Sequence, residues 1–405
     1  MRSCWHMSDA RCLAGHALVE AMRECRARTI ALTCDLSDAQ WQVPRQPGIN
    51  PLAWELAHLA WFAEFWVLRG PHDVDAMGRT HAQRPAMHAG PDALLDSSLL
   101  AHADRWKAPL PARGQALEML ASQLEASIAA VPDANDDAAA LYFHRLALFH
   151  EDMHGEAFAW LRATLGYPPP RDATLDRVVV RKSVEIRGGE VHIGIANDTR
   201  GFAFDNELPG KRVTLTDFEI DAHPITAGQY LRFVESGGYD TPEYWPAEAG
   251  AWRAQAGRHH PERWRRMKEN SLSDVRWQVR WFDRWHALDR EQPLIHVNAF
   301  EAEAYCLWAT RRLPSAAQWE HAAQSAPAFE WGRSVWEWTA DAFQPYSGFV
   351  AGPYKEYSAP WFGDHRELRG GSFATHPRMY DARYRNFFMP QRSDVFAGFR
   401  TVANG

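Results

Sequence analysis

Two histidines four residues apart stand in the stretch HEDMHGEAF, at positions 150 and 154, and Glu156 follows two residues later. In a helix, positions i and i+4 lie on one face roughly 5–6 Å apart, so His150 and His154 can bind one metal ion from adjacent turns. The pair alone is weak evidence, because surface pairs with this spacing occur by chance. Glu156 has two interpretations: it orients a ligand imidazole through the other ring nitrogen, or it is a solvated surface carboxylate.

A third histidine lies in the tryptophan-rich stretch NPLAWELAHLAWFAEFWVLRG. His58 is in helical register with Trp54 and Trp61, so it points along an apolar face toward the interior. It is either a core histidine with satisfied hydrogen bonds or the third ligand of a metal site. Three neutral imidazoles leave coordination positions open, which suits catalytic zinc and non-haem iron alike. His144 is turned by about 120° around its helix from His150 and is excluded from the set.

The elements that must position these histidines are helices. Apolar residues recur at helical spacing over residues 17–36, 50–70, 115–130 and 138–165. The second stretch has Asn50 as its expected N-cap and Pro51 at the first helical position, and it ends at Gly70. Ser37 and Asp38 mark the start of a further helical turn. Four helices with inward apolar faces predict a bundle.

The pattern changes after the proline-rich stretch GYPPPRDATLDR. Strand patterns follow at residues 177–186 and 211–221, and helical patterns return at 298–313 and 315–323. Residues 245–290, dense in Trp and Arg, are expected to form a long ordered insertion. The sequence therefore predicts an α+β protein with a helical domain at residues 1–167, a linker at 168–178 and a mixed domain at 179–405.

The composition is that of an ordinary globular protein, with 46% hydrophobic and 23% charged residues. A net charge of -7 argues against broad nucleic-acid binding, which needs a basic face. No run approaches the roughly 18 apolar residues of a membrane span, and the N-terminus lacks the apolar segment of a signal peptide. Five cysteines show no disulfide framework and no CxxC pair. We expect a reduced, cytoplasmic protein without nucleic-acid or membrane partners. Its 19 tryptophans pack cores or line a pocket for a cation.

Together these pieces resemble the iron-dependent sulfoxide synthase family of ergothioneine biosynthesis. NPLAWELAHLAWFAEFWVLRG and FHEDMHGEAFAW resemble the two helices that supply the three metal-binding histidines of that family. PLIHVNAFEAEAYCLWATRRLPSAAQWEHAA, SVWEWTADAF, LRGGSFAT and YRNFFMPQRSDVFAGFRT follow the order of its second domain. The resemblance implies a DinB-like four-helix bundle followed by a C-type-lectin-related, formylglycine-generating-enzyme-like (sulfatase-modifying-factor) domain. It also implies Fe(2+) as the cofactor, with His58, His150 and His154 as ligands.

The reaction of that family joins a chalcogen atom to C2 of the imidazole of hercynine, the trimethylated betaine of histidine, and consumes O2. The resemblance places Asn386, Phe387 and Met153 beside hercynine; Trp is commoner than Phe at the second of these positions, and some relatives carry Gln at the third. Formylglycine generation itself is not expected. Enzymes with that activity use a late cysteine pair, whereas Cys306 is the only cysteine after residue 34.

The donor motif departs from the family pattern at one position. Synthases that take γ-glutamylcysteine often read RNWD-x-P-x-R, and this chain reads RNFFMPQR over residues 385–392. Phe388 stands where the aspartate would bind the donor, while Arg392 is kept. Losing a charged contact of this type costs about 1.5–3 kcal/mol, so the pocket is less suited to an amino-acid zwitterion. The C-terminal stretches are more like those of the selenoneine synthase branch, which uses a selenosugar.

A sugar is bound by hydrogen-bonding side chains and an aromatic platform, for which Tyr346, Tyr357, Trp361 and Arg392 are candidates. The catalytic tyrosine that delivers a proton in some family members is unassigned; Tyr346 and Tyr357 are its candidates, and one aligned position carries Phe349 instead. We expect a selenoneine synthase that joins selenium from a selenosugar to hercynine. The alternative is an ergothioneine sulfoxide synthase that uses γ-glutamylcysteine or another thiol donor.

Two further classes fit the histidines. A zinc-dependent DinB thiol transferase would share a three-histidine site but would not need the second domain. A metal-binding or betaine-binding protein would keep the histidines without any catalysis. Metal content and O2 consumption separate these classes from an iron synthase, because only the synthase consumes O2 with both substrates present.

Overall fold

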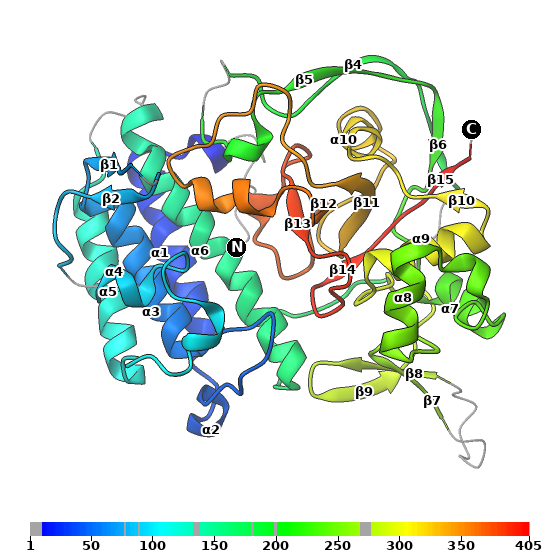
Figure 1. Cartoon of the computed structure of the whole chain (residues 1–405), viewed down its shortest axis with the longest axis horizontal. Coiled ribbons are helices and arrows are strands. Elements are labelled where there is room, and N and C mark those ends of the chain that lie inside the picture. The colour runs from blue at the N-terminus through cyan, green and yellow to red at the C-terminus, as the bar shows by residue number, and fades with distance from the viewer. Residues whose placement is uncertain are drawn as a thin grey trace. The chain divides into compact units, whose positions relative to one another are not determined.

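The computed structural model of the chain describes residues 10–76, 78–87, 90–132, 138–179, 182–197, 201–267 and 277–404. The chain forms two compact units (Figure 1). The helical unit comprises Met1–Leu161, Thr199–Ala203 and Gly352–Glu356, and the mixed unit comprises Arg162–Asp198, Phe204–Ala351 and Tyr357–Gly405. The domain bounds expected from the sequence stay a prediction.

The helical unit is built on four long helices. Its helices are α1 Gly15–Ala31, α2 Asp38–Trp41, α3 Leu52–Ala63, α4 Asp92–Leu95, α5 Arg113–Ala129 and α6 Ala138–Leu165. Its shorter elements are the 3-10 turns η1 Ala10–Cys12 and η3 His102–Asp104, the π-helical turn η2 Glu64–Leu68, and the antiparallel hairpin of β1 His72–Val74 and β2 Thr80–Ala82. The helices α1, α3, α5 and α6 run beside one another (Figure 1), which confirms the predicted bundle.

Local sequence explains one helix start and misplaces another. Ser37 caps α2 as predicted: its hydroxyl accepts a hydrogen bond from the Gln40 amide, and the Gln40 side chain accepts one from the Ser37 amide. The predicted N-cap role of Asn50 is wrong, because α3 begins at Leu52 with Pro51 as its N-cap. The Asn50 side chain instead bonds to Arg105, a tertiary partner that capping rules do not consider.

The end of this helix also differs from the expectation of a single helix that ends at Gly70. The α-helix α3 ends at Ala63, and the chain continues as the π-helical turn η2 before the helical path stops. A π turn holds one residue more than an α turn, so it shifts the side chains that follow it. Helix α3 itself is buried on almost every face, and not only along the apolar stripe.

Helices α1 and α6 pack closely enough to fix the register of the HxxxH segment. Leu18, Met22, Leu141 and Leu148 share a buried apolar cluster, in which each Leu or Met contributes roughly 1.5–3 kcal/mol of burial free energy. A Cβ atom at Gly155 would lie 2.2 Å from Nη1 of Arg28. Glycine next to His154 therefore leaves room for the Arg28 guanidinium against α6.

The mixed unit combines short strands with short helices. Its strands are β3 Val184–Ile186, β4 Gly189–Ile193, β5 Lys211–Leu215, β6 Phe218–Ile220, β7 Trp264–Arg266, β8 Trp277–Trp281, β9 Arg284–Ala287, β10 Arg311–Arg312, β11 Trp336–Ala342, β12 Arg366–Gly370, β13 Asn386–Phe388, β14 Ala397–Gly398 and β15 Val402–Ala403. Its helices are α7 Ala227–Glu235, α8 Ala247–Ala256, α9 Ala299–Trp308 and α10 Ala316–Ser325, with 3-10 turns η4 Asp205–Glu207, η5 Pro242–Tyr244, η7 Ala359–Trp361 and η8 Pro377–Met379. The turn η6 Lys355–Tyr357 has its first two residues in the helical unit and its third in the mixed unit. These elements confirm the α+β class.

Two four-stranded sheets organise this unit, in the orders β10-β15-β6-β3 and β13-β12-β11-β14. All their pairs are antiparallel except the parallel pair β11–β14. Trp319 on α10 packs with Ile220, Phe329 and Val402 in one apolar cluster. Strand β12 carries a buried ion-pair network, described below, directly beside β13.

The predicted strand at residues 177–186 is shorter than expected, since only Val184–Ile186 is a strand and residues 180–181 lie outside the described residues. The segment 245–290 contains α8 and the three-stranded sheet β7-β8-β9, and its residues 268–276 lie outside the described part. No described helix combines the length and the apolar character that a membrane span requires.

Candidate metal centre and substrate residues

His58, His150 and His154 come together in the helical unit, His58 from α3 and the other two from α6. One ligand atom of each residue lies within 4.8 Å of the other two. The ring centroids are 5.2 Å apart for His58–His150, 5.3 Å for His58–His154 and 4.6 Å for His150–His154. Among the described residues, no other group of three His, Cys, Asp or Glu side chains converges in this way.

Two of the imidazoles are held through Nδ1. The Nδ1 of His58 lies 2.7 Å from the carbonyl oxygen of Leu95, and the Nδ1 of His154 lies 2.7 Å from Oε1 of Glu55. Both partners are acceptors, so each Nδ1 carries the hydrogen and donates it. Each Nε2 is then left with a lone pair for a metal ion. A carboxylate behind a ligand histidine is a common arrangement in metal sites.

Aromatic rings fix the planes of the same imidazoles. Trp54 stacks on His58 at 4.8 Å with an interplanar angle of 9°. Phe62 stacks on His150 at 3.6 Å and 7°. The third imidazole, His154, is held by the Glu55 hydrogen bond. The three rings therefore have defined orientations before any ion is bound.

Burial favours the neutral form of two of these histidines, His58 and His150. Desolvation, and then the proximity of His154, holds the pKa of His58 well below its usual value. Desolvation, His154 and His58 do the same to the pKa of His150. Neutral imidazole is the form that binds a metal, so the donor set fits a divalent transition-metal ion. Three nitrogen ligands do not distinguish iron from zinc.

Sequence reasoning missed the carboxylate that orients a ligand. Glu55 is 1% exposed and lies three residues before His58, where a charged side chain in an apolar helix was the available signal. Glu156 is buried, so its interpretation as a solvated surface carboxylate is wrong. His144 lies outside the group, with Nε2 3.3 Å from the carbonyl oxygen of Ser127.

A cavity of about 100 Å³ reaches His58 within the helical unit. Its apolar wall consists of aromatic side chains, namely Trp61, Phe62, Phe65, Trp66 and Tyr354. Its polar rim includes the carboxylates of Asp92, Asp96 and Glu356. The cavity gives a small ligand a path to the imidazole of His58.

Tyr354 is the second residue that sequence reasoning did not single out. Tyr354 lies within residues 346–357, but Tyr346 and Tyr357 were the candidates for the catalytic tyrosine from the sequence alone. The Tyr354 ring contacts Phe62 edge-on at 4.9 Å, and its centroid is 6.1 Å from that of His150. Burial, followed by the Glu356 and Asp96 carboxylates, raises the pKa of Tyr354, so the phenol keeps its proton at neutral pH.

The residues predicted to face hercynine lie in both units. Met153 precedes His154 on α6, whereas Asn386 and Phe387 lie on β13 of the mixed unit. Phe387 stacks on Phe343 at 4.1 Å and 13°, and the Asn386 side-chain oxygen accepts the Phe387 amide at 2.8 Å. Their roles in binding hercynine stay predictions.

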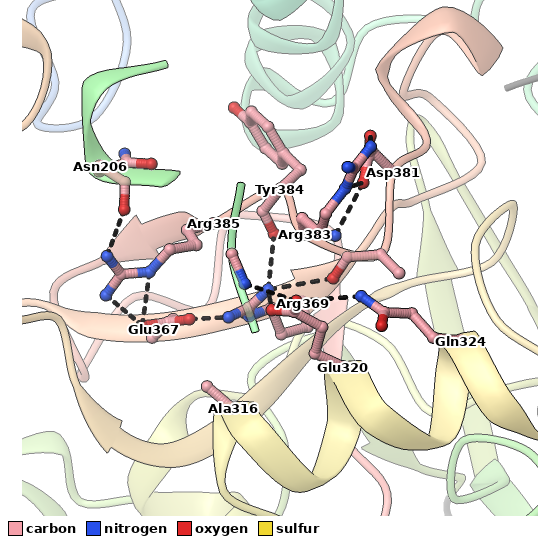
Figure 2. Close-up of polar contacts among 12 residues, drawn as sticks. Asn206, Ala316, Glu320, Gln324, Glu367, Arg369, Asp381, Arg383, Tyr384 and Arg385 are labelled. Carbon is pink, nitrogen blue, oxygen red and sulfur yellow. Dashed lines mark hydrogen bonds and ion pairs between the residues drawn. The ribbon is translucent and has the colours of Figure 1, made fainter. Parts of the chain in front are cut away.

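Strand β13 is anchored by the residue before it. Figure 2 shows Arg385 bonded to Glu367, with Nη2 2.7 Å from Oε2, and to the backbone oxygen of Asn206 at 2.5 Å. Glu367 in turn pairs with Arg369, which also pairs with Glu320 at 2.9 Å. This network fixes the backbone from which Asn386 and Phe387 project.

The predicted donor residues already have partners within the mixed unit. The guanidinium of Arg392 lies 4.9 Å from the ring centroid of Phe388 and forms two hydrogen bonds to Asp394, at 2.9 and 2.5 Å. Tyr346 is buried, its hydroxyl accepts a hydrogen bond from Arg369 at 3.2 Å, and burial raises its pKa to about 12. Tyr357 bonds to the hydroxyl of Tyr384 at 2.9 Å.

Comparison with known proteins follows the division of the chain. Residues 171–334 and 328–405 match the model of the sulfatase-modifying factor enzyme 1-like domain, and residues 21–161 match that of the DinB superfamily. The first match covers more than half of the chain. The chain belongs to the sulfatase-modifying factor enzyme 1-like family.

Its relatives differ in how much of the chain they match. The hercynine oxygenase of Mycolicibacterium smegmatis is 28% identical and covers 96% of this chain and 99% of its own length. That of Mycobacterium tuberculosis is 29% identical, with 94% and 96% coverage. The formylglycine-generating enzyme of Streptomyces coelicolor is 26% identical over 54% of this chain and 88% of its own. This member of the sulfatase-modifying factor enzyme 1-like family therefore matches the hercynine oxygenases over nearly their whole length, and the formylglycine-generating enzyme over about half of this chain.

Proposed function

We propose that the chain is an O2-dependent enzyme that joins a sulfur or selenium atom to C2 of the hercynine imidazole, with iron(II) bound by His58, His150 and His154. The supporting observation is the convergence of these three imidazoles in a chain that resembles hercynine oxygenases over nearly its whole length. Iron, when bound, would supply the redox chemistry that O2 requires.

The reaction has a simple balance. The imidazole C2–H bond and the donor S–H or Se–H bond break, and the new C–S or C–Se bond forms. One oxygen atom of O2 goes to the sulfur or selenium, and the other leaves as water with the two hydrogens. O2 is thereby reduced by four electrons, two from bond formation and two from oxidation of the chalcogen.

The side chains of the helical unit have distinct tasks in this proposal. Glu55 and the Leu95 carbonyl hold two imidazoles in the tautomer that leaves Nε2 free. The aromatic wall of the cavity beside His58 excludes water from the centre. We infer that Tyr354, which burial keeps protonated and whose ring centroid lies 6.1 Å from that of His150, gives or holds a proton during turnover.

The chemistry of formylglycine generation has no support in the mixed unit. Cys306 is the only cysteine there, it is buried in α9, and burial raises its pKa well above the usual value. A buried thiol with a raised pKa is a poor nucleophile and a poor metal ligand. The likeness to formylglycine-generating enzymes thus concerns the fold.

For the donor, we propose a selenosugar. Phe388 offers no charge to a donor ammonium group, and the charge of Arg392 is neutralised by Asp394. A γ-glutamylcysteine donor would have to compete with Asp394 for the guanidinium, at a cost of order 1.5–3 kcal/mol for the displaced charged hydrogen bonds. An uncharged sugar needs no such displacement.

The test is a competition assay. Iron(II)-loaded protein receives hercynine and air, with a selenosugar, its thiosugar analogue and γ-glutamylcysteine at equal concentrations, and products are measured by mass spectrometry. A hercynine–selenium adduct as the main product supports the proposal. A γ-glutamylcysteine sulfoxide adduct would identify an ergothioneine enzyme. Consumption of O2 without formation of any hercynine adduct would overturn the proposed coupling reaction.

A matched pair of variants sharpens the donor assignment. Phe388→Asp restores a carboxylate next to Arg392 and should raise the share of γ-glutamylcysteine product, whereas Phe388→Leu removes the ring without adding charge and should not. Equal product ratios in both variants would place donor selection elsewhere. A zinc-dependent transferase or a binding protein would be recognised in the same experiment, because neither consumes O2.

A further inference from the structure

Arg105 lies outside the candidate ligand set, directly after the turn η3 of the helical unit. Its guanidinium carbon is 3.9 Å from the ring centroid of Trp54. Trp54 is itself stacked on His58, and the Trp54 Nε1 donates to the carbonyl oxygen of Leu94 at 2.9 Å. The planar cation thus holds the indole that fixes the plane of one imidazole.

A second route runs from the same guanidinium to another imidazole. Nη1 of Arg105 donates to Oδ1 of Asn50 at 2.7 Å, and Nδ2 of Asn50 lies 3.5 Å from Oε2 of Glu55. Oε1 of Glu55 accepts from Nδ1 of His154. The side-chain amide of Asn50 can accept a hydrogen bond from Arg105 and donate one to Glu55 in one orientation only. The position of the Arg105 guanidinium therefore fixes the position of the Glu55 carboxylate through this amide.

His150 is reached by neither route. Its plane is set by the stacked ring of Phe62. The three imidazoles are thus held in two ways, two through contacts that lead to Arg105 and one through an independent apolar contact. His58 also has its direct hydrogen bond to the Leu95 carbonyl, so the Trp54 contact sets its plane and not its tautomer.

We propose that Arg105 is a positioning residue of the metal centre, which orients His58 through Trp54 and His154 through Asn50 and Glu55. The inference rests on the proposed function, because it requires the three histidines to bind a metal ion. Arginine suits the task because its planar group stacks on an aromatic ring while it donates in fixed directions, whereas the ammonium group of lysine is a compact point charge.

Co(II) is the probe of choice, because it reports both affinity and the orientation of each ligand. Its dissociation constant is measured by competition with a chelator. The exchangeable imidazole N–H signals of the three ligands are followed in paramagnetically shifted proton NMR spectra, with assignments from single histidine variants. Thermal unfolding of the metal-free protein is recorded in parallel.

Arg105→Met should weaken Co(II) binding measurably, but by less than the roughly 10- to 100-fold loss that follows removal of a group bonded directly to a metal ligand. The N–H signals of His58 and His154 should shift, and that of His150 should stay. Arg105→Lys should restore part of the affinity. Arg113→Met is the matched control, since Arg113 lies 4.7 Å from Trp41 and bonds to the carbonyl oxygens of Leu36 and Cys34, away from the centre.

Co(II) affinity and all three signals unchanged in Arg105→Met would overturn the inference while the proposed function stands. A wild-type chain that binds no Co(II) would overturn both. If Arg105→Met does not fold, Asn50→Leu decides, because it interrupts only the second route. It should shift the His154 signal and leave that of His58, and equal shifts of both signals would contradict the two-route arrangement.

Discussion

The three-histidine centre of the helical unit and the ion-pair network of the mixed unit are both polar clusters enclosed by apolar packing. In the network, Arg369 and Arg385 share Glu367, and Arg369 also pairs with Glu320 (Figure 2), with each side chain at most 2% exposed. In the centre, His58 and His154 each use Nδ1 for a hydrogen bond and keep Nε2 available.

This difference separates a structural cluster from a binding site. Opposite charges that neutralise one another complete their own environment, and they hold β12 and β13 in place. Imidazoles that meet at a common point do not complete theirs, because His58 and His154 each use Nδ1 for a hydrogen bond and keep the Nε2 lone pair available there. Burial alone does not distinguish the two clusters, but the balance of donors and acceptors does.

The largest effect expected is the loss of metal binding in His150→Ala. One of three ligand atoms disappears, and no buried carboxylate is left behind, since Glu55 keeps its bond to His154. Stoichiometric Co(II) or Fe(II) binding, measured by equilibrium dialysis, should be abolished. His144→Ala removes another buried histidine of α6 and should retain full binding. Equal metal content in the two variants would refute the ligand assignment.

Removal of a cation from the network should act on stability instead. Arg369→Met leaves Glu320 and Glu367 without this partner and should lower the free energy of unfolding by about 3–5 kcal/mol. Denaturant titration of the metal-free protein measures the loss. Arg366→Met, on the same strand and with a more exposed partner in Glu303, should cost less than about 1 kcal/mol. Metal affinity of the folded fraction should stay within about twofold of wild type.

Glu55 shares a feature with each cluster, since it is a buried carboxylate like those of the network and it bonds to a candidate metal ligand, His154. Glu55→Gln keeps the shape and an acceptor oxygen but removes the charge behind His154, so metal affinity should fall by about 10- to 100-fold. Glu64→Gln, a buried glutamate of the π turn that accepts from the Met87 amide, is the control. If both variants bind metal as the wild type does, the carboxylate is not a partner of a ligand.

The last prediction concerns the acid stability of the metal-free protein. Burial lowers the pKa of His58, His150 and His296 in the folded state, whereas the unfolded chain takes up protons near pH 6.5. Stability is therefore complete above pH 6.5 and decreases below it, by about 1.4 kcal/mol per pH unit for each histidine. Denaturant titrations between pH 7.5 and 5.5 measure the slope. His296→Gln should make it shallower, and an unchanged slope would show that His296 is protonated in the folded state.

Periodicity and residue type were enough to predict the bundle, whereas the set of His58, His150 and His154 was chosen through the resemblance to the sulfoxide synthase family. The 3.6-residue pattern does not change with tertiary context for long helices such as α1 and α6, and HxxxH fixes two ligands on one face. Asn50 shows why the boundary of α3 was misplaced: a good N-cap residue was recruited by Arg105, 55 residues later in the chain. Local rules do not contain such partners.

Glu55 and Tyr354 show two further limits. Helix α3 is buried on almost every face, so Glu55 has no exposed side of the helix to occupy. The helical pattern of apolar residues therefore could not indicate the partner of Glu55. Tyr354 contacts Phe62 across almost 300 residues of sequence, and nothing in its neighbourhood separates it from Tyr346 and Tyr357. Both needed three-dimensional packing to be recognised.

The segment Gly352–Glu356 belongs to the helical unit although about 190 residues separate it from Leu161, where the main part of that unit ends. A gene divided at the proline-rich linker would therefore yield a first fragment without Tyr354 and one wall of the cavity beside His58. The first half of the chain alone therefore does not contain the whole helical unit. A fragment that ends at the linker would contain the three histidines but would lack Gly352–Glu356 and, with it, Tyr354.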